Sequence, residues 1–138
     1  GGESGTGLQK GLKETGWLFA SHGYGHRHTA SISYNSLVED TTRWKNEIAS
    51  LVGDTDIYIY PYGEEIDYPS QKLTYLQSEG FRFFCGVWAS KPFVVVKDGY
   101  VRQTRCNLDG YTMTKRPESV SDLIDASKVL DQRRPELE

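Results

Sequence analysis

The amino-acid sequence predicts an α/β protein in which short buried strands alternate with amphipathic helices to form part of a parallel sheet. Three observations support this prediction. Short apolar runs alternate with segments of helical periodicity along much of the chain. The connections between these segments are short, as is typical of βα units. An Asp-Gly pair at residues 98–99 separates two runs rich in β-branched residues, which is the signal of a β-hairpin.

The composition fits one soluble globular domain and argues against two kinds of partner. The 138 residues include 16 Lys and Arg and 19 Asp and Glu, so the formal net charge is −3. Binding to nucleic acid needs a clustered excess of basic residues, which this chain lacks. Apolar runs such as residues 93–96 are far shorter than the roughly 20 residues that cross a bilayer. We therefore expect no nucleic-acid partner and no membrane span.

The first part of the chain predicts a loop, a helix and a strand. Residues 1–7 are polar and rich in glycine, which is typical of a loop or linker. Residues 8–15 carry leucines at helical spacing, and Gly16 marks the expected end of this helix. Residues 17–20 are continuously apolar, as expected for a strand buried on both faces. This strand would end directly before His22.

The strongest helical pattern begins at Asn35 or Ser36, either of which can cap the helix. Its apolar residues recur at helical intervals up to Val52, and charged residues that include Asp40 fill the other face. Residues 57–60 combine β-branched and aromatic side chains, which predicts a second buried strand.

A further helix and strand follow. The helix is expected to begin at residues 68–70 and to end at Gly80, and residues 81–87 are the third predicted strand. Residues 8–90 would therefore form the βα units.

Residues 91–138 are expected to add a hairpin and a C-terminal helix. Residues 93–97 and 100–105 flank Asp98-Gly99, a pair that favours a two-residue type I′ turn. Residues 119–130 carry apolar side chains at helical spacing among Asp and Lys, which predicts an amphipathic helix.

Cys85 and Cys106 are too few to define a disulfide scaffold, and neither belongs to a Cys-x-x-Cys pair. We expect two buried thiols, with a single bridge between them as the alternative.

The three strand ends indicate where a site would lie, because ligands of α/β folds bind at the carboxyl ends of the strands. The segments that follow the predicted strands are residues 22–26, 61–63 and 88–90. All three histidines of the chain, His22, His26 and His28, fall within seven residues, immediately after the first predicted strand.

The spacing of His22 and His26, together with their position after a predicted strand, indicates a metal site. Four residues apart, two imidazoles lie on the same side of a helical turn and can both reach one metal ion at about 2.0–2.1 Å. The alternative is a polar loop whose histidines bind backbone groups or solvent, and spacing alone favours neither. The position at a strand end favours the metal.

A catalytic zinc site usually has three protein ligands and an open position for water. Glu64, Glu65 and Asp67 are the nearby candidates for a third ligand, although acidic residues after a turn are more often solvated.

Other residues at these ends have both structural and functional interpretations. Tyr62 and Trp88 are either parts of a turn and of the core or stacking surfaces for a sugar ring. Arg102 and Arg105 lie three apart on a strand and so point to opposite faces, and we expect one of them to face solvent.

At these residues the chain resembles the polysaccharide deacetylase family, the NodB-homology domain of the carbohydrate esterases. Residues 19–27, Phe-Ala-Ser-His-Gly-Tyr-Gly-His-Arg, resemble the metal-binding histidine motif of the family. Residues 60–63, Tyr-Pro-Tyr-Gly, resemble its proline-aromatic motif. The resemblance extends from about Leu8 to Trp88.

The resemblance implies part of a distorted (β/α) barrel that binds zinc or another divalent metal and hydrolyses N- or O-acetyl groups on carbohydrate. His22 and His26 would be metal ligands, and the backbone N–H of Tyr62 would contact the oxyanion. Pro61, Tyr62, Trp88 and Tyr24 would contact the acetylated carbohydrate. A secreted or cell-envelope location is implied as well.

The sequence departs from the family pattern at several points. The family's Asp-Asp motif would precede the histidine segment, and a complete barrel takes about 250 residues. We therefore expect residues 1–138 to be a single partial domain, the C-terminal portion, that is inactive alone and associates with itself or with an N-terminal fragment. Ile59 stands where the family has Arg, and no histidine follows His28 to act as general acid. Arg105 is a candidate to stabilise charge instead.

Two other functions compete with the deacetylase. The first is a non-catalytic carbohydrate-binding or cell-envelope module on the same scaffold, with Tyr24, Tyr62 and Trp88 as stacking surfaces. The second is a small α/β interaction domain in which the histidines have no joint role.

Overall fold

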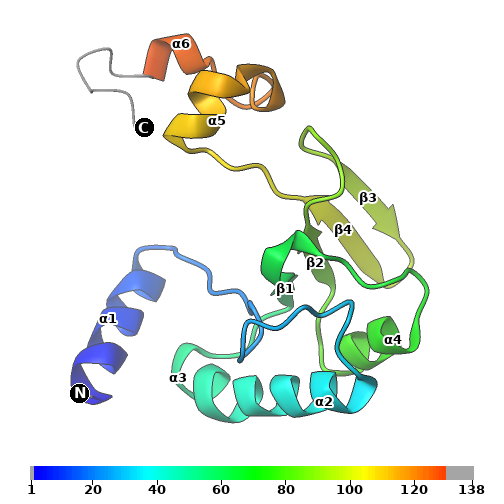
Figure 1. The fold of residues 1–138 in the computed structure, drawn as a ribbon. Coiled ribbons are helices and arrows are strands. Elements are labelled where there is room, and N and C mark those ends of the chain that lie inside the picture. Colours follow the sequence, from blue (N-terminus) through cyan, green and yellow to red (C-terminus); the bar gives the residue numbers. More distant parts are fainter. Residues whose placement is uncertain (1, 130–138) are drawn as a thin grey trace.

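A four-stranded sheet with the strand order β1–β2–β4–β3 lies at the centre of the structure (Figure 1). The strands are β1 (Ile57–Ile59), β2 (Phe83–Gly86), β3 (Val94–Lys97) and β4 (Tyr100–Thr104). β1 pairs with β2 and β2 with β4 in parallel, whereas β3 and β4 are antiparallel. The structure is a computed structural model, and it describes residues 2–129, with side chains from residue 7.

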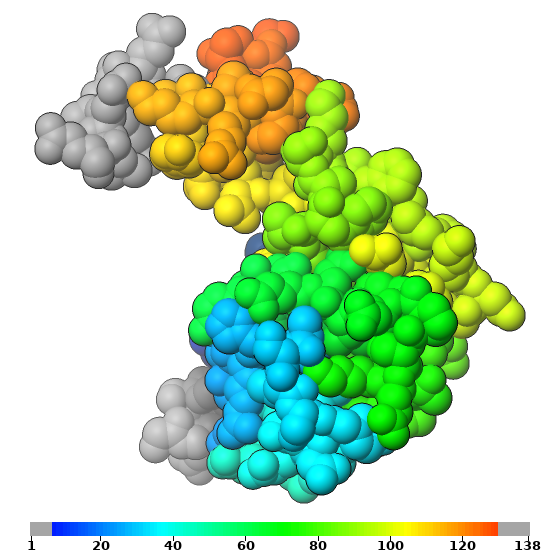
Figure 2. Space-filling model, turned by 45° about the vertical axis from the view of Figure 1, so that its right-hand side comes forward, coloured from blue at the N-terminus to red at the C-terminus, as the bar shows by residue number. Residues whose placement is uncertain are grey.

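Helices follow the strands in the expected alternation. They are α1 (Gly2–Glu14), α2 (Tyr34–Arg43), the π-helical segment η1 (Trp44–Ala49), α3 (Ser50–Val52) and α4 (Gln71–Ser78). The C-terminal helices are α5 (Gly110–Lys115) and α6 (Ala126–Val129), and short 3₁₀ turns cover Pro61–Gly63 and Pro117–Ser119. In the space-filling view, α5 and α6 lie beyond the sheet, at the end opposite α2 and α3 (Figure 2). No described helix is long and apolar enough to cross a membrane.

The core lies between one face of the sheet and the helices α2, η1, α3 and α4. Tyr58 of β1, Tyr60 directly after it and Phe84 of β2 contribute to this core and are almost completely buried. The helices contribute Leu37, Trp44, Val52, Leu73 and Leu76. Ile57 and Ile59 on the other face are only partly buried, so the second predicted strand is covered on one side alone.

Local signals predicted the central elements correctly. The helix expected from Asn35 or Ser36 to Val52 is present as α2, η1 and α3, although its N-cap is Ser33, whose hydroxyl accepts the N–H of Ser36 at 3.1 Å. Ser70 caps α4 in the same way by accepting the N–H of Leu73 at 3.1 Å.

The prediction for the first twenty residues was wrong in two places. The expected loop at residues 1–7 is helical from Gly2, because extending the helix of residues 8–14 costs less than starting a new one. Residues 17–20 form no strand, and only Ser21 makes an isolated parallel bridge, to Tyr58. Trp17 and Leu18 are 66% and 83% exposed. An apolar run is buried on both faces only where other layers cover it, and the described residues supply no such cover here.

The predicted hairpin is confirmed, and it is part of the main sheet rather than a separate addition to it. Its second strand, β4, pairs with β2, with Phe84 opposite Arg102, so the hairpin supplies half of the four strands. The predicted type I′ turn is wrong. That turn needs a positive φ at both central residues, and of the pair only Gly99 has one (φ 81°).

The described sheet is open, so the predicted barrel is not confirmed, whereas the α/β class and the mostly parallel pairing are. The single helix predicted at residues 119–130 is also wrong. Among the described residues of this range, only Ala126–Val129 form an α-helix, α6, and Ser119 ends a 3₁₀ turn. Asp125 accepts the N–H of Ser127 at 3.1 Å and so favours a helix start at that point. Leu130 lies outside the described residues.

Cys85 and Cys106 are unpaired and partly buried, so the single bridge is not formed. Burial raises the pKa of the Cys85 thiol.

We predict that Phe84→Ala lowers the free energy of unfolding by about 3–5 kcal/mol, because it leaves a cavity in a core that covers Phe84 completely. Phe93→Ala is the matched control, since Phe93 is 53% exposed. Urea denaturation measures both, and equal losses would contradict the assignment of the core.

Candidate active site

Four segments meet at the carboxyl ends of the parallel strands. The N–H of Val87, after β2, donates to the carbonyl of Gly63, after β1, at 3.1 Å. Arg105, after β4, donates from its backbone to Gly86 at 2.8 Å and from Nη2 to the carbonyl of Tyr60 at 3.1 Å. His22, after the Ser21 bridge, joins them through Ile59. These segments therefore lie together at one edge of the sheet, although the strand predicted before His22 is not formed.

His22 and His26 lie side by side, with ring centroids 4.8 Å apart and ring planes at 71°. Nδ1 of His22 lies 2.8 Å from the carbonyl oxygen of Ile59. A carbonyl oxygen can only accept, so Nδ1 carries the proton and Nε2 of the neutral ring is free to accept or to ligate. The hydrogen bond to Ile59 thus fixes the orientation of the His22 ring and leaves Nε2 as the nitrogen that can bind a ligand.

The two histidines are not brought together by a helical turn, as their spacing had predicted. Residues 22–33 contain no helix, and the loop bends through left-handed backbone at Gly23 (φ 68°) and His26 (φ 49°). A non-glycine residue with positive φ is uncommon. The pair therefore depends on contacts that hold the loop from outside.

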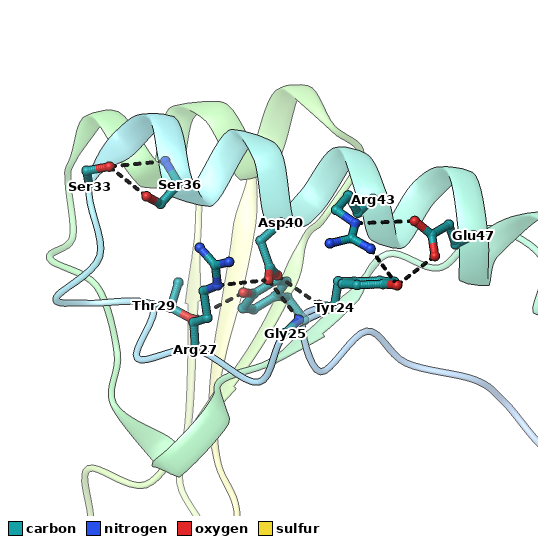
Figure 3. A network of polar contacts seen from close by, with 10 residues as sticks. Tyr24, Gly25, Arg27, Thr29, Ser33, Ser36, Asp40, Arg43 and Glu47 are labelled. Carbon is teal, nitrogen blue, oxygen red and sulfur yellow. Dashed lines mark hydrogen bonds and ion pairs between the residues drawn. The ribbon is translucent and has the colours of Figure 1, made fainter.

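Asp40 of α2 makes those contacts (Figure 3). Its carboxylate accepts the backbone N–H groups of Tyr24 and Gly25, each at 2.8 Å, and its side chain is only 5% exposed. The sequence pattern had assigned Asp40 to the polar face, which is wrong. A signal was present, because Asp40 lies three residues after Leu37 and four before Trp44, on the buried side of the helix.

Tyr24 points toward the same helix (Figure 3). Its hydroxyl donates to Glu47 at 2.6 Å and accepts from Nη2 of Arg43 at 2.9 Å, and the Arg43 guanidinium lies 4.1 Å from the ring centroid. The hydrogen bond to Glu47 raises the pKa of Tyr24. The predicted contact of Tyr24 with substrate stays a prediction, and its hydroxyl is engaged within the protein.

Tyr62 lies beside the histidines and is 57% exposed. The His28 ring stacks on it at 3.9 Å, and the His26 ring meets it edge-on at 4.7 Å. The Tyr62 backbone is left-handed, with φ 59° and ψ 2°. In the space-filling view the histidine segment (blue) adjoins the segment after β1 (green) (Figure 2). Tyr62 is therefore an exposed aromatic surface next to the histidine pair.

None of the three acidic candidates joins the histidine pair. Glu64 binds Nδ1 of His28 at 2.8 Å, and Asp67 is exposed. Glu65 is not solvated as expected, because it is buried against Arg102, whose Nε and Nη2 lie 2.9 and 2.5 Å from its Oε2. Burial raises the pKa of Glu65, and Arg102 opposes the shift. In the part of the chain that the structure describes, no group of three metal-ligating side chains comes together.

Arg102 also organises the aromatic residues at this edge. Its guanidinium carbon lies 4.6 Å from the Tyr68 ring centroid and 4.5 Å from that of Trp88. Trp88 remains partly exposed, so one part of its ring is available to a ligand. The expectation that Arg102 or Arg105 faces solvent is wrong, because both guanidinium groups bind protein oxygens.

A separate hollow of about 650 Å³ lies at the other end of β1, between α1 and the sheet. Lys13, Trp17, Ile57 and Gly80 are among its lining residues. None of the three histidines lines this hollow. It lies at the edge of the sheet where residues 17–20 form no strand.

We predict that Gly63→Ala lowers the free energy of unfolding by about 2–4 kcal/mol, through left-handed strain plus overpacking. Gly63 has φ 73°, and a Cβ there would lie 2.6 Å from Cγ2 of Val87. The control is Gly80→Ala, with φ 95° and no atom within 4 Å of the added Cβ, for which we expect about 1 kcal/mol. Equal losses in urea denaturation would show that Val87 does not restrict the turn.

A family match covers both the histidine loop and the turn after β1. The family is described as polysaccharide deacetylase, and its model matches residues 3–84 of the 138. No curated protein and no solved structure matches the chain. The resemblance expected from residues 19–27 and 60–63 is therefore confirmed. Because the match covers more than half of its residues, the chain belongs to the polysaccharide deacetylase family.

Proposed function

We propose that this protein is a metal-dependent carbohydrate deacetylase in which His22 and His26 hold Zn²⁺ or another divalent cation. The observation that carries the proposal is the hydrogen bond from Nδ1 of His22 to Ile59, which leaves Nε2 free beside the His26 ring. A metal-ligating histidine usually donates its other ring N–H to a carbonyl or carboxylate, and His22 has this arrangement.

The donor set of the chain fits such an ion. Imidazole nitrogens are common zinc ligands, and two of them leave positions of a tetrahedral site for water, substrate or a further ligand. A bound zinc ion would lower the pKa of a water molecule and polarise the acetyl carbonyl.

We propose further roles for residues at the neighbouring strand ends. Pro61 is buried and begins the turn rigidly, so the backbone N–H of Tyr62 has a fixed direction in which to stabilise an oxyanion. The exposed Tyr62 ring and the partly exposed Trp88 ring would bind sugar faces. Arg105 would stabilise developing negative charge from its position on the Tyr60 carbonyl.

The substrate proposed is an acetylated carbohydrate, with the acetyl group on nitrogen or oxygen. The proposal includes a place of action outside the cell or in its envelope, which rests on the family alone.

A second candidate function is a non-catalytic carbohydrate-binding module. Two features of the chain favour it: Ile59 occupies the position where the family carries Arg, and no histidine follows His28. Such a module would keep the aromatic surfaces of Tyr62 and Trp88 and would bind sugar in the presence of a chelator.

The deciding experiment measures Zn²⁺ affinity by titration calorimetry and acetate release from acetylated oligosaccharides on the same samples. We expect His22→Ala and His26→Ala each to weaken zinc binding about 100-fold or more, because each removes a ligand. Any acetate release should be lost with the metal. His28→Ala is the matched control for zinc affinity, since its ring binds Glu64 and stacks on Tyr62.

Each outcome has one meaning. Zinc binding and acetate release that depend on both histidines support the deacetylase. Sugar binding that survives both a chelator and the loss of either histidine supports the binding module, whereas zinc binding without acetate release does not, because residues 1–138 are expected to be inactive alone. No zinc binding by the wild type would refute the metal-dependent mechanism.

Tyr62→Gly separates the proposed backbone and side-chain roles. Glycine adopts the left-handed conformation easily and keeps the N–H, so we expect kcat to stay within about threefold while KM rises several-fold. Tyr111→Ala, at an exposed tyrosine of α5, is the control. A fall in kcat as large as that in kcat/KM would instead assign the ring to the transition state.

A further inference from the structure

The loop that carries the two histidines is held at its midpoint by one buried carboxylate. Tyr24 and Gly25 lie between His22 and His26, and their amides donate to the two different oxygens of Asp40, Oδ2 and Oδ1, each at 2.8 Å. The carboxylate comes from the middle of α2, a helix fixed in the core by Leu37 and Trp44 (Figure 3).

We propose that Asp40 is a positioning residue that sets the spacing and orientation of His22 and His26. The inference rests on the proposed function, because it assigns Asp40 to the site that would bind metal. We do not assign Asp40 as a ligand, because no group of three metal-ligating side chains that would include it comes together among the described residues.

The contact explains why the loop needs no helix. A free loop between two ligands would lose conformational entropy when they converge on one ion. Fixing the two central amides removes much of that freedom beforehand, which is the effect of preorganisation on affinity. His22 is anchored separately by Ile59, so the loop is tied at its first ligand and at its midpoint.

A carboxylate suits this position better than an amide. Two converging N–H donors need two acceptor oxygens, and an asparagine would turn its own NH₂ toward one of them. Burial of the charge at Asp40 is compensated by these two donors and by Arg27, whose Nε lies 4.0 Å from Oδ1.

The glycines of the loop fit the same explanation. A Cβ on Gly23 would lie 3.1 Å from Oδ2 of Asp40, and one on Gly25 would lie 3.0 Å from Oδ1. The pattern His-Gly-x-Gly-His thus leaves room for the carboxylate to approach the backbone.

Tyr24 adds a second tie between loop and helix. Its side chain binds Arg43 and Glu47, which follow Asp40 at helical spacing and so lie on nearby parts of one face (Figure 3). The side chain and the backbone of Tyr24 therefore both bind the same helix.

The first experiment compares Zn²⁺ affinity of the full chain with that of Asp40→Asn and Asp40→Ala by titration calorimetry. We expect both variants to bind zinc about 10–100-fold more weakly, the range typical of changes just outside a metal's ligands. Asp54→Asn is the matched control, because Asp54 is an exposed carboxylate that pairs with Lys45 and does not touch the loop. Thermal melts identify any variant that fails to fold.

The second experiment needs no metal. NMR of the metal-free chain measures amide exchange at Tyr24 and Gly25 and the ring-to-ring NOE between His22 and His26. We expect Asp40→Asn to speed exchange at one or both amides and to weaken the NOE at an unchanged fold, a result that a general loss of stability would not give.

A double-mutant cycle tests the direct contact. Gly25→Ala alone should weaken zinc binding because its Cβ meets Oδ1 of Asp40, whereas in the Asp40→Ala background it should add little. Additive losses would overturn the role of that contact.

The outcomes separate this inference from the proposed function. If Asp40→Asn keeps wild-type zinc affinity and the ring NOE, the positioning role is refuted while the metal site stands. If the wild type binds no zinc, the proposed function fails. The metal-free NMR comparison then still supports or refutes the control of the histidine pair by Asp40.

Discussion

The packing of the aromatic face of β1 and β2 against α2, η1 and α4 is the interaction on which the rest of the structure depends. Tyr58, Tyr60 and Phe84 are buried almost completely, so the strand ends next to them have fixed positions. The acceptor of His22 is the carbonyl of Ile59, and the acceptor of Arg105 is that of Tyr60. Loss of the aromatic packing would therefore displace both contacts at once.

The same helix serves the core and the loop. α2 places Leu37 in the core and Asp40 under the histidine loop, within one turn of each other. Because a helix moves as a rigid element, the geometry of the loop is linked to the packing of α2 on the sheet. The buried carboxylate of Asp40 accepts two backbone N–H groups, which offset the cost of removing its charge from water.

The chain keeps some features of its family and changes others. The histidine pair and the Pro61–Gly63 turn are adjacent. Ile59 stands where the resemblance led us to expect Arg, and no histidine follows His28. Arg102 binds Glu65, and its guanidinium lies over the Trp88 ring. Arg105 donates to the carbonyl of Tyr60, directly before the turn. The groups that would bind metal and sugar can therefore be tested separately from those that would move protons.

The sequence by itself determined the elements whose signals are local. The strand at residues 57–60, the helix that ends at Val52 and the hairpin around Gly99 follow from periodicity and turn chemistry. The histidine pair was expected from its spacing, but the helical turn and the strand on which that expectation relied are not present. Only the tertiary structure decided which partners these elements meet. The parallel pairing of β4 with β2, the exposure of Trp17 and Leu18 and the burial of Asp40 all depend on groups distant in sequence. A helical pattern interprets a charged residue as solvent-facing, because it contains no information on the two amides of a distant loop that donate hydrogen bonds to this carboxylate inside the protein.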